Sequence, residues 1–157
     1  MATDIEQVIS LALQSKTIAV VGLSRNPAKP SNQIASYLKS HGYHVVPINP
    51  ATNEDLGEKT YRSLLDLPDH LKRRIDVVDI FRRSEDVPLA VDQAIELHHS
   101  YTHPGFVWMQ LGIVNEEAAA KARKAGLGVV MDRCMMVESE RRRLNVSRPS
   151  LPSRTPS

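Results

Sequence analysis

Of the 157 residues, 41% are hydrophobic and 24% are charged, proportions that predict one soluble globular domain with a substantial core. A formal net charge of +2 with only 4% aromatic residues argues against a nucleic-acid-binding surface. No apolar run reaches the roughly 20 residues needed to span a bilayer, no signal-peptide pattern opens the chain, and the one cysteine, Cys134, excludes an intramolecular disulfide. We therefore expect a cytoplasmic protein whose partners include neither nucleic acid nor a membrane.

The elements expected along the chain alternate between helices, in which apolar residues recur every three or four positions, and short apolar strands rich in β-branched residues. The helices are bounded by side chains that can cap a first turn and by glycines that can end the last. In the first half of the chain we expect a helix over 5–13 behind the capping box Thr3–Glu6, a strand over 17–21, a helix that Ser31 caps and Gly42 ends, and a strand over 44–50 that closes in a turn. A short helix over 61–67 before Pro68 and a strand over 75–81 follow. In the second half we expect a helix that Ser84 caps, a strand over 106–110, a helix from Asn115 to Gly126, and a strand over 127–131.

This order of elements predicts an α/β fold of three layers. Strands that alternate with helices pair in parallel, and strands that are apolar on both faces are covered by helices on both faces. We expect a doubly wound domain over residues 1–145 with a mainly parallel five-stranded sheet. Residues 146–157 are rich in proline and serine and carry little apolar surface, so we expect them to form a disordered tail.

The most informative stretch runs from Thr17 to Ser31. An apolar strand breaks at Gly22, passes through a polar loop and enters an amphipathic helix. A glycine here lets the backbone approach a ligand closely, and the N-terminus of the following helix offers N–H groups and a positive dipole end to a phosphate. Gly22 is the one glycine of this loop, so the G-x-G-x-x-G pattern of ordinary dinucleotide-binding domains is missing.

The end of the second strand points away from a simple NAD site. Such a site usually places an Asp or Glu there to accept a hydrogen bond from a ribose hydroxyl, and this chain has Asn49 instead. A neutral Asn49 with Arg25 and Lys29 nearby suits a ribose that carries its own phosphate. Both coenzyme A and NADP have such a ribose, so charge alone does not decide between them.

Five blocks of sequence, in this order, resemble the small stand-alone CoA-binding proteins, which are similar to the CoA-binding domain of the succinyl-CoA synthetase alpha subunit. The blocks are V-G-L-S-R-N-P-A-K-P-S, Y-H-V-V-P-I-N-P, D-V-V-D-I-F-R-R-S-E, V-W-M-Q-L-G-I-V-N-E-E-A and V-V-M-D-R-C. The resemblance covers residues 5–142. It implies a Rossmann-like domain that grips the nucleotide end of coenzyme A or an acyl-CoA.

The resemblance also implies a set of coenzyme-binding residues. Those after the first strand would surround the phosphates, those after the second would lie beside the adenosine, and those after the third and fourth would form further walls. The complete expected set is Gly22, Leu23, Ser24, Arg25, Lys29, Ser31, Asn49, Pro50, Asp79, Ile80, Phe81, Gln110, Leu111 and Gly112. We expect no catalytic residue and no metal ligand.

Three functions remain open at this point. The first is a binding module for coenzyme A without independent catalysis, because no second domain with a phosphorylated histidine follows in this sequence. The second is an NAD(P)-binding oxidoreductase module, although the Tyr-x-x-x-Lys pair is missing around Tyr37. The third is a regulatory module that reads acyl-CoA and passes its state to a protein partner or to a second copy of the chain.

Other candidate sites have simpler interpretations beside the functional one. His98, His99 and His103 have metal-ligand spacing, but no cysteine or clear carboxylate completes the set, and a surface turn explains them equally. Cys134 is either a thiol that reacts with coenzyme A or a small semi-buried residue. Arg133 meets a phosphate or pairs with Asp132. The arginines over 141–143 are read as a solvated helix end, and Trp108 is read as core.

Overall fold

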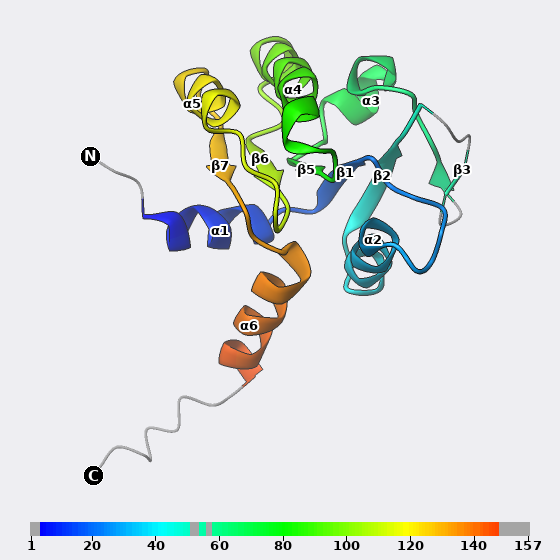
Figure 1. The fold of residues 1–157 in the computed structure, drawn as a ribbon, viewed down its shortest axis with the longest axis vertical. Helices are drawn as coiled ribbons and strands as arrows, with labels where there is room; N and C mark the ends of the chain where they lie inside the picture. Colours follow the sequence, from blue (N-terminus) through cyan, green and yellow to red (C-terminus); the bar gives the residue numbers. More distant parts are fainter. Residues whose placement is uncertain (1–3, 51–53, 56–57, 148–157) are drawn as a thin grey trace.

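Five parallel strands form the sheet around which the chain is built (Figure 1), in the order β2-β1-β5-β6-β7. The computed structural model describes residues 4–50, 54–55 and 58–147. In chain order the elements are α1 (Ile5–Leu13), β1 (Thr17–Val21), α2 (Pro30–Ser40), β2 (His44–Ile48), β3 (Glu54–Asp55), β4 (Glu58–Lys59), the 3₁₀ turn η1 (Leu64–Asp66), α3 (Asp69–Lys72), β5 (Val77–Ile80), the 3₁₀ turn η2 (Ser84–Asp86), α4 (Val87–Tyr101), β6 (Phe106–Met109), α5 (Glu116–Lys124), β7 (Gly128–Val130) and α6 (Met135–Ser147). The α/β, Rossmann-like fold with a parallel five-stranded sheet is confirmed.

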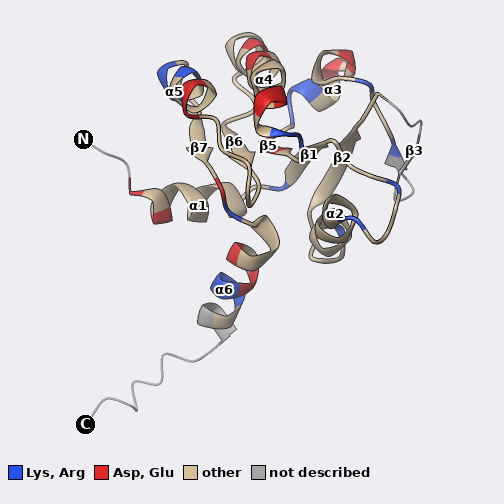
Figure 2. Ribbon diagram, in the orientation of Figure 1, with Lys and Arg blue, Asp and Glu red and all other residues tan. Residues whose placement is uncertain are grey.

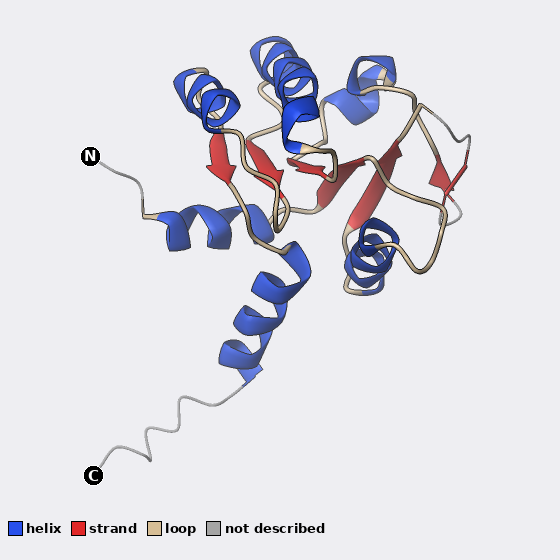
Figure 3. Ribbon diagram, in the orientation of Figure 1, coloured by secondary structure: helices blue, strands red, loops and turns tan. Residues whose placement is uncertain are grey.

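The two faces of the sheet carry separate hydrophobic cores, because successive side chains of a strand point in opposite directions. On β1, Ile18 and Val20 pack against α1, α2 and Met135 at the start of α6. Ala19, between them, belongs to the other core, which contains buried residues of η1, α3, α4 and α5. Figure 3 shows the resulting layers, with helices above and below the strands.

Helix starts agree with the sequence where a side chain can reach a free N–H. Asn115 caps α5, as predicted, by accepting a hydrogen bond from Ala118 N at 2.9 Å. Asp4 caps α1 by accepting one from Glu6 N at 3.1 Å, and Thr3, with which the predicted capping box begins, lies outside the described residues. The prediction that Ser31 caps α2 is wrong. Pro30 takes the first position of that helix, behind Lys29, because its fixed φ and missing N–H suit a first turn.

Three further features of the fold differ from the sequence prediction. Ser84 begins the turn η2, and α4 starts after Asp86. The short helix expected over 61–67 is wrong: only η1 forms there, Tyr61 bridges to Ile48 as an isolated β-pair, and α3 follows Pro68. The strands β3 and β4 pair in antiparallel orientation, which no sequence pattern predicted.

At its C-terminal end the described chain finishes in α6, which includes residues 146 and 147 of the expected tail. The rest of that tail, 148–157, lies outside the described residues. Within the described ranges, no helix has the length and hydropathy that crossing a membrane requires.

Candidate functional site

The order of the strands reverses beside β1, and this position organises the site. The chain runs from β1 outward to β2 and then crosses back to β5 on the other side of β1. In open parallel sheets the loops that follow the two diverging strands separate and leave a crevice at the carboxyl edge. The loops after β1, β5 and β6 meet at this edge.

A cavity of about 500 Å³, here called the main cavity, opens among these loops and the start of α2. Its volume is in the range that takes a small ligand or part of a cofactor. Two cationic residues, Lys29 and Arg82, line it, and no acidic residue does so in the part of the chain that is described. Ile34, Phe81 and Ile113 contribute apolar walls.

Gly22 begins the loop after β1 with a φ of +87°, and its N–H donates to the Ile48 carbonyl at 2.8 Å. A Cβ at this position would lie 2.7 Å from the Phe81 carbonyl oxygen and 3.0 Å from Arg82 Cδ. The glycine therefore admits a neighbouring loop of the protein itself. Our sequence interpretation, that it admits a ligand, stays a prediction; Gly22 also lines the main cavity.

The rest of this loop is folded onto the start of α2. Ser24 N donates to Ser31 Oγ at 2.9 Å, and Asn32 Nδ2 donates to the Ser24 carbonyl at 2.8 Å. Ser24 Oγ accepts from Asn26 N at 3.1 Å, and its hydroxyl hydrogen has no acceptor among the described residues. Ser24 lines the main cavity, and its hydroxyl keeps a hydrogen with which it can donate.

Asn49 holds the loop from the side of β2. Its Nδ2 donates to the Leu23 carbonyl at 2.7 Å, and its backbone N donates to the Tyr61 carbonyl at 2.8 Å. Leu23 is fully buried in one of the cores. The Asn49 amide group therefore supports the shape of the loop, and neither residue is among those that line the main cavity.

Beneath the main cavity lies a buried carboxyl group. Asp79 Oδ1 accepts from Gln110 Nε2 at 2.6 Å, and Gln110 Oε1 accepts from Met135 N at 3.3 Å. Burial raises the pKa of Asp79 to about 8, so the neutral form predominates near pH 7. Its Oδ2 has no hydrogen-bond partner in the described structure. Asp79 is therefore an uncharged support below Gln110, which lines the cavity.

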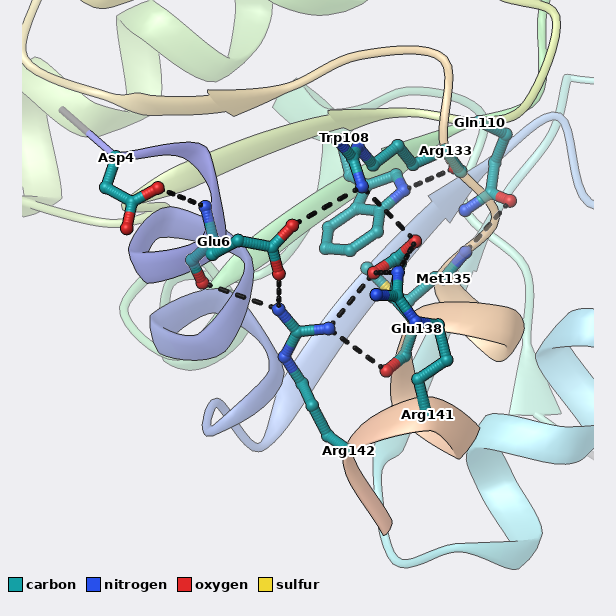
Figure 4. A network of polar contacts seen from close by, with 9 residues as sticks. All are labelled: Asp4, Glu6, Trp108, Gln110, Arg133, Met135, Glu138, Arg141 and Arg142. Carbon is teal, nitrogen blue, oxygen red and sulfur yellow. Dashed lines mark hydrogen bonds and ion pairs between the residues drawn. The ribbon is translucent and has the colours of Figure 1, made fainter. Parts of the chain in front are cut away.

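The start of α6 closes the same wall and is tied back to α1 (Figure 4). Glu138, with 7% of its side chain exposed, accepts hydrogen bonds from Arg141 at 3.1 Å and from Arg142 at 3.0 Å, and pairs with Arg133 at 3.5 Å. Arg142 also pairs with Glu6 of α1 at 2.6 Å. Figure 2 shows acidic residues on α1 and residues of both charges on α6.

This network refines two expectations. Arg133 pairs with Glu6 and Glu138 and not with Asp132, and its contact with a phosphate stays a prediction. The arginines over 141–143 form ion pairs, while Arg141 and Arg143 remain exposed to solvent, as expected of a helix end. Trp108 is core, as predicted: it is fully buried, and its Nε1 donates to the Arg133 carbonyl at 2.8 Å.

A second cavity of about 270 Å³ lies at the end of β2 and the start of α4. It shares Gly22 and Arg82 with the main cavity. Pro50 lines it, as do Arg62 and Leu89. The two cavities therefore meet at the point where the strand order reverses.

The structure brings half of the expected set together. The main cavity is lined by Gly22, Ser24, Lys29, Ser31, Phe81, Gln110 and Leu111, and the second cavity adds Pro50. The remaining residues line neither cavity: Leu23, Arg25, Asn49, Asp79, Ile80 and Gly112. Ile80 is core, Arg25 is exposed to solvent, and Gly112 N donates to Asp132 Oδ1 at 2.7 Å, which joins the loops after β6 and β7.

Sequence reasoning missed Pro30, Ile34, Arg82 and Ile113, which also line the main cavity. Arg82 carried a usable signal, because it follows β5 directly. Cys134 lines the same cavity and is half-buried.

The histidines considered for a metal have other neighbours. His98 Nδ1 lies 2.8 Å from the Pro104 carbonyl, and His103 Nδ1 lies 3.1 Å from the Ile75 carbonyl. The described residues hold no cluster of three His, Cys, Asp or Glu side chains with metal-binding geometry.

Comparison with known proteins connects this geometry to a family. A family model described as a CoA binding domain matches residues 16–140. The uncharacterized protein YneT of Bacillus subtilis is 38% identical over 124 residues, which cover 79% of this chain and 85% of that protein. A hypothetical protein from Pyrococcus horikoshii superposes with a TM-score of 0.78 at 40% identity, covering 89% of this chain and 92% of that one.

A larger protein contains the same fold as one part. The dinucleotide-forming acetyl-coenzyme A synthetase 1 of Ca. Korarchaeum cryptofilum, solved with phosphate and ADP, superposes with a TM-score of 0.63 at 28% identity. The match covers 82% of this chain but only 27% of the synthetase.

Proposed function

Because the chain belongs to the family of CoA-binding domains, we propose that it binds coenzyme A or an acyl-CoA in the main cavity, as a binding module without catalysis of its own. The charge of that cavity carries the proposal. Lys29 and Arg82 line it without an acidic residue beside them in the described structure, and such surroundings favour a diphosphate.

The start of α2 would receive the diphosphate. Lys29 precedes this 11-residue helix, whose N-terminus carries the positive end of the helix dipole. The Ser24 hydroxyl lines the same side of the cavity and adds a donor. Arg25, which we expected to meet the phosphates, is exposed and lines neither cavity, so Lys29 and Arg82 replace it in this proposal.

The apolar walls would receive the pantetheine arm. Ile34, Phe81 and Ile113 offer the hydrocarbon surface that its methyl and methylene groups can cover. Gln110 also lines the cavity, with its side-chain amide held by Asp79 and Met135 N. The proposal ends at binding: most of the synthetase chain lies outside the region matched here, and its ligase chemistry is not proposed for this chain.

The test is a calorimetric titration of the purified protein with CoA, acetyl-CoA, NAD and NADP. We expect CoA or acetyl-CoA to bind at least about tenfold more tightly than either dinucleotide, a difference of about 1.4 kcal/mol. Equal or tighter binding of NAD or NADP would overturn the proposal, and so would a failure of both CoA and acetyl-CoA to bind.

A pair of lysine variants places the ligand. Lys29→Ala should lower the affinity for CoA by about threefold to tenfold, the size of one solvent-screened ionic contact. Lys124→Ala makes the same change of charge at the exposed end of α5, at the opposite edge of the sheet, and should leave the affinity unchanged. If both variants bind like the unmodified protein, the phosphates lie away from α2.

A further inference from the structure

Two arginines without an ion pair in the described structure line the second cavity. Arg62, from the segment after β4, and Arg82, from the loop after β5, both line it. No hydrogen bond or ion pair joins either guanidinium to another residue in the described part of the chain.

The acidic residues of the same cavity have an arginine of their own. Glu85 and Asp86 line it, and Arg83, which does not, pairs with both: Arg83 Nη1 lies 3.5 Å from Glu85 Oε2, and Arg83 Nε lies 3.0 Å from Asp86 Oδ2. Three arginines therefore face two carboxylates here, and neither Arg62 nor Arg82 is ion-paired to them in the described structure. A cavity with two such guanidinium groups suits a phosphate, which arginine binds through parallel N–H donors.

The position of this cavity identifies the phosphate. It meets the main cavity at Gly22 and Arg82 and is bounded by Ile48 and Pro50 at the end of β2. In doubly wound domains the end of the second strand is where the adenosine ribose lies. A coenzyme whose diphosphate lies beside α2 would therefore bring its ribose toward Arg62.

Resting on the function proposed above, we propose that the second cavity is a subsite for a phosphate on the adenosine ribose, and that Arg62 is the residue that selects the phosphorylated ribose. Arg62 takes the role that the sequence suggested for Arg25. Arg82 lines both cavities and contacts the diphosphate as well. Its loss therefore lowers the affinity for a coenzyme with the ribose phosphate and for one without it alike.

The experiment compares CoA with dephospho-CoA, which differ only in the 3′-phosphate, by calorimetric titration of the full chain and its variants. For the unmodified protein we expect CoA to bind about fivefold to tenfold more tightly than dephospho-CoA. Arg62→Gln should bring the ratio of the two affinities close to one, because it lowers the affinity for CoA and leaves that for dephospho-CoA unchanged. Arg62→Lys should restore part of the ratio. Arg74→Gln removes an exposed arginine from the opposite edge of the sheet and should keep the full ratio.

The outcomes separate the two proposals. If CoA binds but the ratio is the same in Arg62→Gln as in the unmodified protein, the subsite is overturned and the proposed function stands. If neither CoA nor dephospho-CoA binds the unmodified protein, the proposed function fails and the subsite fails with it. A ratio that falls in Arg74→Gln as much as in Arg62→Gln shows a general effect of net charge and also overturns the subsite.

Discussion

Gln110 Nε2 donates to Asp79 Oδ1 at 2.6 Å across two neighbouring strands, with Gln110 3% exposed and Asp79 fully buried. The same glutamine accepts from Met135 N, so one side chain joins the floor of the main cavity to the start of α6. Burial raises the pKa of the Asp79 carboxyl group from an ordinary value of 3.8 to about 8. Its protonation therefore affects both stability and the wall of the site.

The unfolding free energy should depend on Asp79 as the pH changes. Because the folded pKa of about 8 exceeds the ordinary 3.8, the folded protein holds the extra proton between these values, and its stability falls as the pH rises toward 8. Asp79→Asn keeps an oxygen acceptor for Gln110 and removes the titration. In urea unfolding from pH 5 to 9, the unmodified protein should lose up to about 1.4 kcal/mol per pH unit relative to this variant, levelling above pH 8. Parallel curves for the two proteins would contradict the shift.

Gly22 and Gly112 form a matched pair for testing the contact at the loop after β1. Both have left-handed backbones, with φ of +87° and +84°. A Cβ on Gly112 has nothing within 4 Å, whereas one on Gly22 lies 2.7 Å from the Phe81 carbonyl oxygen. Gly112→Ala should cost about 1 kcal/mol of unfolding free energy, and Gly22→Ala should cost at least about 1 kcal/mol more. Equal losses in urea unfolding would show that the close approach is absent in solution.

Glu138 should contribute more to stability than an exposed acid that also pairs with arginine. Glu138→Gln leaves Arg133, Arg141 and Arg142 without their shared carboxylate, at a cost of about 1–3 kcal/mol. Glu85→Gln removes a pair whose carboxylate side chain is 66% exposed and should cost less than about 0.5 kcal/mol. Urea unfolding of both variants checks the ranking, and a Glu138→Gln loss no larger than the Glu85→Gln loss would show that the network does not anchor α6.

The thiol of Cys134 should be protected when the main cavity is filled. It lines that cavity and is half-buried, so a bound coenzyme covers it. The rate of alkylation by iodoacetamide, followed by intact mass, should fall several-fold at saturating acetyl-CoA, whose blocked sulfur does not consume the reagent. NAD at the same concentration should leave the rate unchanged. An unaltered rate with acetyl-CoA, alongside binding seen by calorimetry, would place the ligand elsewhere.

The strands were predictable from the sequence because each is buried on both faces and so shows a continuous apolar run, as Thr17–Val21 does. The helix that Asn115 begins was predictable because a local cap decides its start. The start of α2 was not, since Pro30 prevails over the better-known signal of Ser31. In β3 and β4, each with two residues, there is no period to detect.

The site was predictable as a set of loops but not as a set of side chains. Parallel strands bring their following loops to one edge, which is why Gly22, Ser24 and Gln110 were found together. Which way a side chain turns depends on partners distant in sequence. Asn49 donates to the Leu23 carbonyl, and Arg83 is held by two acids while Arg82 is not. Adjacent arginines with opposite surroundings look alike in the sequence.

The two sides of the main cavity are made at different times during synthesis. Gly22 and Ser24 leave the ribosome early, whereas Cys134 and the Met135 N–H that bonds to Gln110 come near the end of the described chain. Because N-terminal segments emerge first, a nascent chain has the loop after β1 long before it has the opposite wall. A ribosome-bound chain that stops before Cys134 is therefore an incomplete receptor. We therefore expect immobilised CoA to retain nascent chains that extend past Cys134 and not those that stop before it.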